Sequence, residues 1–151
     1  MAKKVKKRPG VGVGLIVVRD GKILLSPRLK PYGFKKLALP GGHVEWMESL
    51  IKTAVRETFE EAGIEIDPKK IRNTLAYSEE IHPKLGKHYV TFYLIAACPK
   101  GQDAIDKEPH KHGPWGWYDP FNLPKRAWLP TRRIVQHPWV KTMIQECEKW
   151  K

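Results

Sequence analysis

Apolar residues follow a strand-like pattern over the first quarter of the chain. Residues 11–18 (VGVGLIVV) and 23–25 (ILL) are apolar, and Asp20-Gly21 lies between the two runs. An Asp-Gly pair in this position is typical of a β-hairpin turn. A basic stretch interrupted by Pro and Gly then predicts a loop over 26–36, and a short apolar run over 37–39 stops at Pro40-Gly41-Gly42, which we expect to break the chain.

From Met47 onward the apolar spacing becomes helical. Residues of the repeat recur at intervals of three and four, at Leu50, Ile51, Ala54, Val55, Thr58, Phe59 and Ala62. This spacing predicts one amphipathic face, and Gly63 is suited to end the helix. The expected helix has about 15 residues, well within the usual range for globular proteins.

The second half predicts more strands and a closing helix. Residues 74–81, 88–98 and 115–118 are rich in β-forming residues and are separated by Pro, Gly and Lys clusters. Residues 132–150 have a helical pattern. We expect the helix itself to lie after Pro138, because proline is tolerated in a first turn and not in a helix interior. The order of elements predicts an α/β chain, more closely an α+β mixed-sheet sandwich with helices packed on the sheet.

Length and composition fit a soluble globular protein. The chain has 151 residues, 41% hydrophobic and 29% charged, which excludes a disordered or fibrous class. We expect a basic N-terminal tail over 1–9 and one domain over 10–151. The sequence lacks a run of roughly 18 apolar residues and a secretory leader, so we expect a cytoplasmic protein with no membrane partner. Cys98 and Cys147 form neither a disulfide framework nor a metal-binding C-x-x-C spacing.

The charge balance favours an anionic partner. The 28 Lys and Arg residues exceed the 16 Asp and Glu residues by 12. On charge alone, a nucleotide, a nucleic acid and an acidic membrane surface all remain open. Five of the cations lie in the tail, which is more often a solvated end than a nucleic-acid arm, so the tail supports no functional assignment.

Three carboxylates of the predicted helix are neighbours. Glu57, Glu60 and Glu61 stand at i, i+3 and i+4, where like charges repel unless a partner neutralises them. A divalent cation is a suitable partner because Mg²⁺ binds carboxylate and phosphate oxygens together. Taken alone, most such acidic runs are solvated helix faces.

The surrounding residues make this segment specific, because it resembles the Nudix box. The matching positions are Gly42, Glu48, Arg56-Glu57, Glu60-Glu61, Gly63 and Ile64. A chance match of the seven fixed residues at a given start is on the order of one in 10⁸. Thr58 departs from the usual aliphatic residue, Met47 from a common Gly and Leu37 from a common Trp, and none of these is a metal ligand in the family.

The resemblance implies a Nudix fold whose box forms a loop-helix-loop around one or more Mg²⁺ ions, with Mn²⁺ as a second usable ion. Family members hydrolyse a nucleoside diphosphate linked to another group. By this resemblance Glu57, Glu60 and Glu61 bind the metal together with the carbonyl of Gly41. Arg56 and Glu48 resemble the pair that orients the cluster, and an arginine beside carboxylates favours their charged form.

A carboxylate is also expected to take a proton from the attacking water. Glu57 and Glu60 are candidates, and Glu108 is our choice because the segment from Lys107 to Trp117 resembles an acid-then-aromatic segment of MutT-like enzymes. Glu79 and Glu80 stay open as alternatives. For the substrate, we expect Trp115 and Trp117 to hold a base and Arg28 to bind phosphate, with weaker candidates at Lys35, Lys36 and His43. The other tryptophans are assigned to packing.

The MutT-like features favour a Mg²⁺-dependent nucleoside triphosphate pyrophosphohydrolase, which releases a nucleoside monophosphate and pyrophosphate for nucleotide-pool sanitation or control. Other Nudix substrates stay open: ADP-ribose, a dinucleotide, an RNA 5′ end or a prenyl diphosphate. RNA is not favoured, because so short a chain leaves little surface for it. A non-catalytic nucleotide-binding protein is the third alternative, although such members usually lack box glutamates. Small members of the family often form homodimers, which leaves a homodimer open here.

Overall fold

The computed structural model describes residues 6–150, and it begins with the predicted hairpin. Strand β1 (Gly10–Arg19) pairs antiparallel with β2 (Lys22–Pro27), with Val18 opposite Ile23. Asp20 and Gly21 have φ angles of 50° and 70°, the left-handed values that a tight hairpin turn requires. Of the predicted tail, residues 1–5 lie outside the described residues, and residues 6–9 are exposed and belong to no helix or strand.

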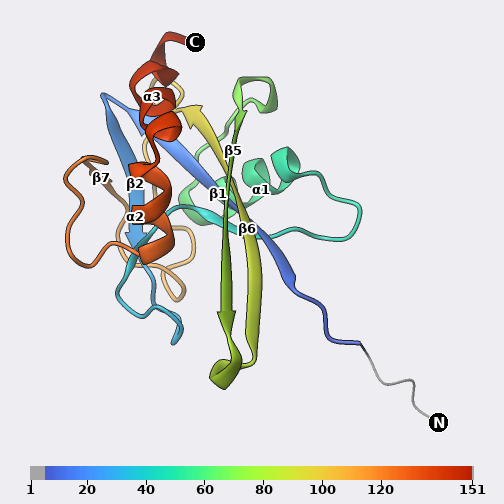
Figure 1. Ribbon diagram of the computed structural model, residues 1–151. Helices are drawn as coiled ribbons and strands as arrows, with labels where there is room; N and C mark the ends of the chain where they lie inside the picture. Colours follow the sequence, from blue (N-terminus) through green and yellow to red (C-terminus); the bar gives the residue numbers. More distant parts are fainter. Residues whose placement is uncertain (1–5, 151) are drawn as a thin grey trace.

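The strands form one mixed sheet (Figure 1). Its order is β3-β2-β1-β6-β5, with β4 paired to β1 and β7 paired to β2. β1 runs parallel to β6 and antiparallel to its other neighbours. The remaining strands are β3 (Leu37–Ala38), β4 (Gly41–His43), β5 (Arg72–His82), β6 (Lys87–Ala97) and β7 (Gly116–Tyr118).

Strand β4 corrects the expectation that Pro40-Gly41-Gly42 only breaks the chain. Gly41 pairs with Gly14 of β1, and Gly42 pairs with Val13. A Cβ atom on Gly41 would lie 2.1 Å from the carbonyl oxygen of Val13. The glycines therefore permit a strand contact that a larger residue would block, since glycine in a strand allows another backbone to approach closely.

Helix α1 (Leu50–Ala62) carries most of the box and confirms the helical periodicity. The side chain of Ser49 accepts a hydrogen bond from the Lys52 backbone, and Gly63 closes the helix with a φ of 68°. The helix has 13 residues rather than about 15 because Met47, with a φ of 64°, still belongs to the preceding loop. A short 3₁₀ turn, η1 (Pro68–Lys70), leads into β5, and η2 (Pro83–Leu85) joins β5 to β6.

The C-terminal region is helical over a longer stretch than predicted. Helix α2 (Leu129–Gln136) precedes Pro138, and α3 (Pro138–Glu146) begins at that proline and continues into η3 (Cys147–Trp150). Pro130 is accommodated in the first turn of α2, where its missing N–H is not needed. Pro138 thus separates two helices, and the helical region begins before it, at Leu129.

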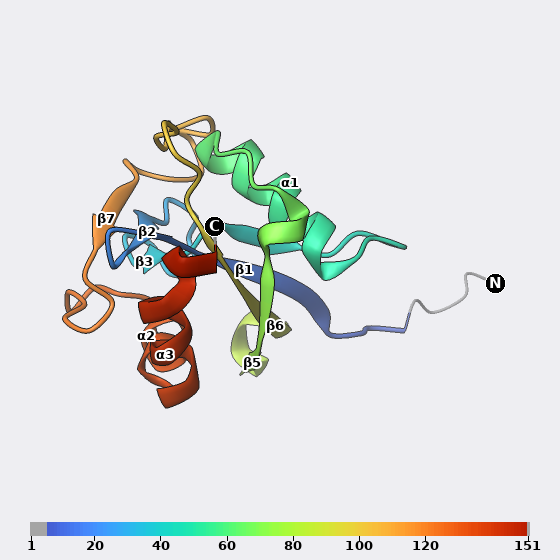
Figure 2. The ribbon, with the colours of Figure 1, turned by 90° about the horizontal axis from the view of Figure 1, so that it is seen from above.

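The sheet lies between α1 on one face and α2 with α3 on the other (Figure 2). Alternate residues of β1 enter different cores: Val13, Leu15 and Val17 pack on the α1 side. Ile16 and Val18 pack on the side of α2 and α3. Burial on both faces explains the nearly continuous apolar run of β1. Among residues 6–150, no helix is long and apolar enough to cross a membrane.

Candidate active site

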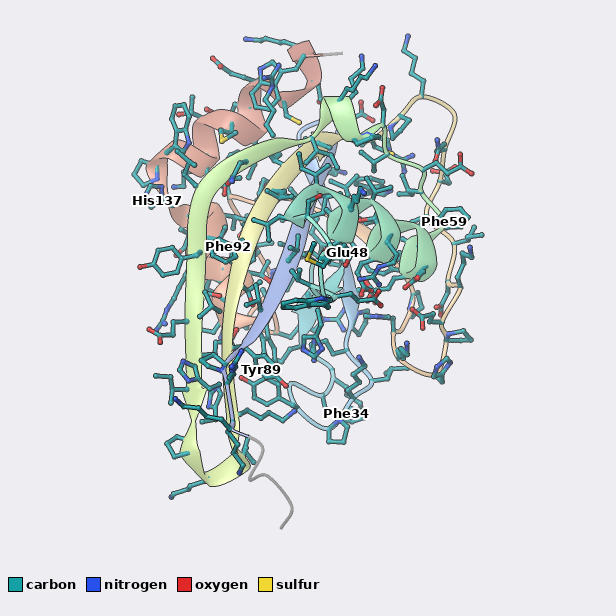
Figure 3. The ribbon with its side chains drawn as sticks, turned by 90° about the vertical axis from the view of Figure 1, so that its right-hand side faces the viewer. Phe34, Glu48, Phe59, Tyr89, Phe92 and His137 are labelled. Atoms are coloured by element: carbon teal, nitrogen blue, oxygen red, sulfur yellow. The ribbon has the colours of Figure 1, made fainter. Side chains whose placement is uncertain are left out.

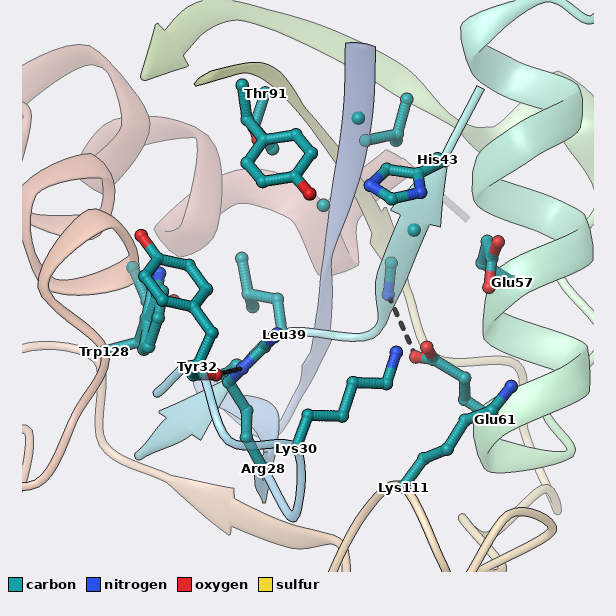
Figure 4. A pocket seen from close by; sticks show the side chains of 18 of the residues that line it. Arg28, Lys30, Tyr32, Leu39, His43, Glu57, Glu61, Thr91, Lys111 and Trp128 are labelled. Carbon is teal, nitrogen blue, oxygen red and sulfur yellow. Dashed lines mark hydrogen bonds between the residues drawn. The ribbon is translucent and has the colours of Figure 1, made fainter. Parts of the chain in front are cut away.

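A cavity of about 500 Å³ opens between α1 and the loop that follows β2 (Figure 4). The floor is the glycine-rich part of β1 together with β4 and β6. The residues that line it are Gly12, Val13, Gly14, Arg28, Lys30, Tyr32, Ala38, Leu39, Gly41, Gly42, His43, Glu45, Glu57, Glu61, Lys87, Tyr89, Thr91, Tyr93, Lys111, Trp128 and Thr131. Carboxylates gather on one side and aromatic residues on the other.

The acidic wall consists of Glu57, Glu61 and the adjoining Gly41 and Gly42 of β4. Glu61 is buried, with 4% of its surface exposed, and its Oε2 accepts a hydrogen bond of 3.0 Å from the Gly41 backbone N–H. A Cβ atom on Gly42 would lie 2.3 Å from Oε1 of Glu57. Both carboxylates therefore reach the cavity floor because the facing strand has no side chains there.

Arg56 organises the carboxylates of the box. Its Nε and Nη2 donate to the two oxygens of Glu48 at 2.8 and 2.9 Å, and Nη1 donates to Oε1 of Glu57 at 2.8 Å. This is the orienting pair that the resemblance implied, and Glu48 lies beside α1 (Figure 3). The bidentate contact with Arg56 lowers the pKa of Glu48 to about 2.

Glu60 is placed differently from its two neighbours. Its side chain is 49% exposed, does not line the cavity, and contacts Nη1 of Arg56 at 3.3 Å. Within the described part of the chain, no three His, Cys, Asp or Glu side chains are gathered so as to hold a metal ion. The structure therefore brings Glu57 and Glu61 together at the cavity, whereas Glu60 contacts Arg56 outside the cavity lining.

The acidic wall nevertheless suits a magnesium ion. Mg²⁺ is usually bound through one or two protein carboxylates, with waters and substrate phosphate oxygens completing its coordination. Burial raises the pKa of the Glu57 carboxyl, and nearby Glu61 adds to that rise while the hydrogen bond from Arg56 opposes it. Two crowded carboxylates with an unfavourable charge arrangement are a donor set that a divalent cation would stabilise.

The aromatic wall consists of Arg28, Tyr32 and Trp128. The rings of Tyr32 and Trp128 meet edge to face with centroids 5.1 Å apart, and the guanidinium of Arg28 lies 4.9 Å from the Trp128 ring centroid. Nε of Arg28 also donates to the Tyr32 carbonyl at 3.1 Å. Gly33, with a φ of 76°, lies so close that a Cβ would come within 1.6 Å of the Trp128 ring. Only glycine fits this position beside the tryptophan.

Cationic side chains connect the two walls. Besides the predicted Arg28, the cavity is lined by Lys30, Lys87 and Lys111, which sequence reasoning did not single out. Burial lowers the pKa of the Arg28 guanidinium, and the negative charges of Glu61 and Glu80 oppose that shift. The four residues come from three separate segments, so the only sequence signal was the basic character of residues 26–36.

The predicted base Glu108 lies next to the cavity and not among its lining residues. It forms an ion pair with Lys111, which does line the cavity, and this contact lowers the pKa of Glu108. Of the two alternatives, Glu80 accepts a hydrogen bond of 2.7 Å from the Tyr32 hydroxyl, and exposed Glu79 pairs with His88.

The structure does not bring Trp115 and Trp117 to the cavity. Both pack against the core on the α1 face of the sheet. The guanidinium carbon of Arg19 lies 4.1 Å from the centroid of the Trp117 ring. The indole N–H of Trp115 donates to the Glu61 carbonyl at 3.1 Å. Trp128, which the sequence assigned to packing, provides the aromatic surface instead. Of the weaker phosphate candidates, only His43 lines the cavity, stacked on Tyr89, while Lys35 and Lys36 are exposed outside it.

Comparison with known proteins identifies the family. A model of the NUDIX domain matches residues 6–138. An ADP-ribose pyrophosphatase of Methanocaldococcus jannaschii is 35% identical over 126 residues, which cover 79% of this chain and 67% of that protein. An isopentenyl-diphosphate Delta-isomerase of a Jannaschia species is 26% identical over 150 residues, covering 89% of this chain and 76% of the relative.

Solved structures support the same assignment. The MutT NUDIX hydrolase of Burkholderia pseudomallei superposes with a TM-score of 0.77 at 32% identity, covering 87% of this chain and 99% of that one. The domain match spans the whole box and the cavity residues on β1, β4, α1 and β6. The chain therefore belongs to the Nudix family, in its MutT-like branch, and is a pyrophosphohydrolase that acts on diphosphate-containing substrates.

Proposed function

We propose that this enzyme hydrolyses nucleoside triphosphates to a nucleoside monophosphate and pyrophosphate in a Mg²⁺-dependent reaction. One observation carries the proposal: the same cavity has an acidic wall at one side, an aromatic wall at the other, and cationic side chains between them. A nucleotide has the matching parts, since its polyphosphate is anionic and binds metal while its base is flat and apolar.

Glu57, Glu61 and the carbonyl of Gly41 are the groups that would hold the cation, with Glu60 as a further predicted ligand. When bound, Mg²⁺ would polarise the phosphate oxygens and lower the pKa of a bound water. Arg56 holds Glu57 at 2.8 Å and, through Glu48, is itself held to the start of α1. Its contribution is to fix the carboxylate in one orientation, which keeps the site arranged before substrate binds.

Cationic side chains would hold the phosphate chain. Arg28, Lys30, Lys87 and Lys111 provide four positive charges around the cavity, against three carboxylates, Glu45, Glu57 and Glu61. A bound divalent cation would make this surface strongly positive, which suits a triphosphate. Arg28 is the best placed to orient an oxygen, because its guanidinium is already fixed by Tyr32 and Trp128.

The nucleobase would pack against Trp128 and Tyr32. Stacking on an aromatic side chain contributes about 1–3 kcal/mol per base and accepts many bases. The edge-to-face contact between the two rings and the position of Gly33 hold this wall in place without substrate. A fixed wall reduces the entropy that binding would otherwise lose.

Among the predicted bases, Glu57 is better placed than Glu108 to take a proton from the attacking water. Glu57 lines the cavity beside the groups that would hold the cation, so its carboxylate would lie near a water bound there. Glu108 forms an ion pair with Lys111, and of these two residues only Lys111 lines the cavity. We therefore assign the proton transfer to Glu57.

ADP-ribose is the second candidate substrate, favoured by the 35% identity to the Methanocaldococcus jannaschii ADP-ribose pyrophosphatase. It also joins a base to a diphosphate, so it would use the same two walls. A dinucleotide and an RNA 5′ end also carry a base, whereas a prenyl diphosphate fits least well because its chain has no flat ring to pack on Trp128. A non-catalytic role fits poorly with a complete set of box glutamates.

The deciding experiment incubates the full chain and Mg²⁺ with normal and oxidised nucleoside triphosphates, ADP-ribose, a capped dinucleotide and a prenyl diphosphate. Chromatography identifies the products. Monophosphate with pyrophosphate, lost on addition of a chelator, is the expected result. Hydrolysis confined to ADP-ribose or another substrate would replace the proposed substrate, and no hydrolysis of any would contradict the proposal.

A further inference from the structure

Glu61 differs from Glu48, Glu57 and Glu60 in the side chain that lies against its carboxylate. Arg56 contacts each of those three carboxylates but makes no contact with Glu61. Glu61 is nevertheless the most buried of the four, and an ionised carboxylate in such a position needs compensation. The side chain that lies against it is His112, whose Nε2 is 3.2 Å from Oε1 of Glu61.

The His112 ring is as buried as the carboxylate that it faces. The two side chains are 7% and 6% exposed, and neither ring nitrogen of His112 makes an aligned hydrogen bond among the described residues. A buried polar group without a hydrogen bond is unfavourable, so one that persists calls for an explanation. The explanation that we draw is the nearby Oε1 of Glu61, which is a hydrogen-bond acceptor 3.2 Å from Nε2 of His112.

The segment around His112 is itself well anchored. The His112 backbone forms an isolated bridge with Arg28, and the Gly113 N–H donates to the Pro27 carbonyl at 2.8 Å. The ring also lies 5.4 Å from that of Trp115, whose indole N–H donates to the Glu61 backbone carbonyl. Residues 112–115 therefore hold both the backbone and the side chain of Glu61.

We propose that His112 is a positioning residue for the metal site: it holds Oε1 of Glu61 while Gly41 holds Oε2, and so fixes the carboxylate at the cavity floor. The inference rests on the proposed function, since Glu61 is a metal ligand only within it. His112 does not line the cavity and would not touch substrate or metal. Partners of this kind orient a metal-binding group, and their removal weakens metal binding by about 10- to 100-fold.

The test measures Mn²⁺ binding to the full chain without nucleotide, from the loss of the free-ion signal in electron paramagnetic resonance. His112→Leu fills the site but removes both nitrogens, and we expect the Kd for Mn²⁺ to rise about 10- to 100-fold. His112→Gln places an amide N–H near the position of Nε2 and should restore binding to within about 3-fold. His110→Leu, at an exposed histidine of the same segment, is the matched control and should bind as wild type.

Two further variants keep the outcome interpretable. If His112→Leu does not fold by circular dichroism, His112→Asn replaces it, because its amide is too short to reach Oε1 and should bind Mn²⁺ more weakly than His112→Gln. If the folded Leu or Asn variant binds Mn²⁺ as tightly as wild type while Glu61→Gln binds it more weakly, the proposed role of His112 is wrong. The assignment of Glu61 as a metal ligand then stands. Unchanged affinity in Glu61→Gln shows instead that the metal assignment is wrong, and the inference fails with it.

Discussion

The two walls of the cavity are built in different ways. The acidic wall comes from β4 and α1, which are close in sequence; Arg56 fixes Glu57, and the backbone N–H of Gly41 donates to Glu61. The aromatic wall joins Arg28 and Tyr32, from the loop after β2, to Trp128, which is far away in sequence and meets them only in the folded chain. In the function that we propose, the first wall serves bond cleavage and the second serves substrate choice.

With these proposed roles, the two walls should affect the rate of the reaction and the binding of substrate separately. A carboxylate that acts on the metal should affect kcat, whereas a ring that packs on the base should affect mostly KM. Substitutions in the two walls should therefore produce different kinetic patterns on the same substrate. The following predictions test that separation, beginning with the largest expected effect.

Glu57→Gln should have the largest effect. The loss of a metal-binding and proton-accepting carboxylate should lower kcat by about 1,000-fold, equivalent to about 4 kcal/mol of transition-state stabilisation. Steady-state kinetics at saturating Mg²⁺ measures the change, and circular dichroism verifies the fold. Glu146→Gln, at an exposed carboxylate of α3, is the matched control. A normal kcat in Glu57→Gln would remove the acidic wall from the chemistry.

Trp128→Ala should raise KM by about 5- to 150-fold with a smaller change in kcat, because it removes the stacking surface. Trp139→Ala, at a tryptophan that is 52% exposed on α3, should leave KM unchanged. Trp117→Ala should lower the melting temperature without raising KM, since Trp117 packs against the core. A larger rise of KM in Trp117→Ala than in Trp128→Ala would restore the base-binding role first predicted for Trp117.

Lys87→Gln should raise KM for a nucleoside triphosphate by about 10-fold, the effect of one charge-assisted phosphate contact. The difference in KM between the variant and the wild type should decrease as salt is added, because salt screens the attraction between Lys87 and phosphate in the wild type. Lys84→Gln, on the exposed turn of the same hairpin, provides the comparison. Equal effects of the two substitutions would indicate a general charge effect and no contact in the cavity.

The smallest expected effect is that of low pH on the free energy of unfolding. The pKa of Glu48 is lowered from its ordinary value of 4.5 to about 2 by Arg56. The stabilisation is therefore complete above about pH 4.5 and is lost as the pH falls toward 2, by about 1–2 kcal/mol after allowance for solvent screening. Denaturant unfolding at pH 5 and pH 3 measures this loss. Glu48→Gln should lose less stability over that interval, and an equal loss would contradict the assignment.

The acidic wall could be predicted because its residues are local. The box places Glu57, Glu61 and Arg56 within two helical turns, so helical spacing alone defines their neighbourhood. The same holds for the hairpin of β1 and β2, whose turn residues are adjacent. Local geometry follows from backbone preferences that a single segment contains.

The aromatic wall could not be predicted because no segment contains it. Trp128 reaches the cavity only because Gly33 leaves room for its ring, and these residues are joined by tertiary packing. Trp115 and Trp117 have the pattern of a base platform, but β7 pairs with β2, and both side chains pack against the core on the α1 side and do not line the cavity. The closing helices were predicted only in part, because Pro138 confined the expected helix to the residues after it, whereas α2 (Leu129–Gln136) has Pro130 in its first turn and ends before Pro138.

The parallel pairing of β1 with β6 has a consequence for how the protein folds. Gly12 and Thr91, which both line the cavity, are partners in that register. The cavity floor can therefore form only after β6 has been synthesised and has closed a long loop back to β1. Such non-local pairing is slow, typically on the millisecond to second scale for sheet-rich domains. The cavity should accordingly form together with the main folding transition and not in an early intermediate.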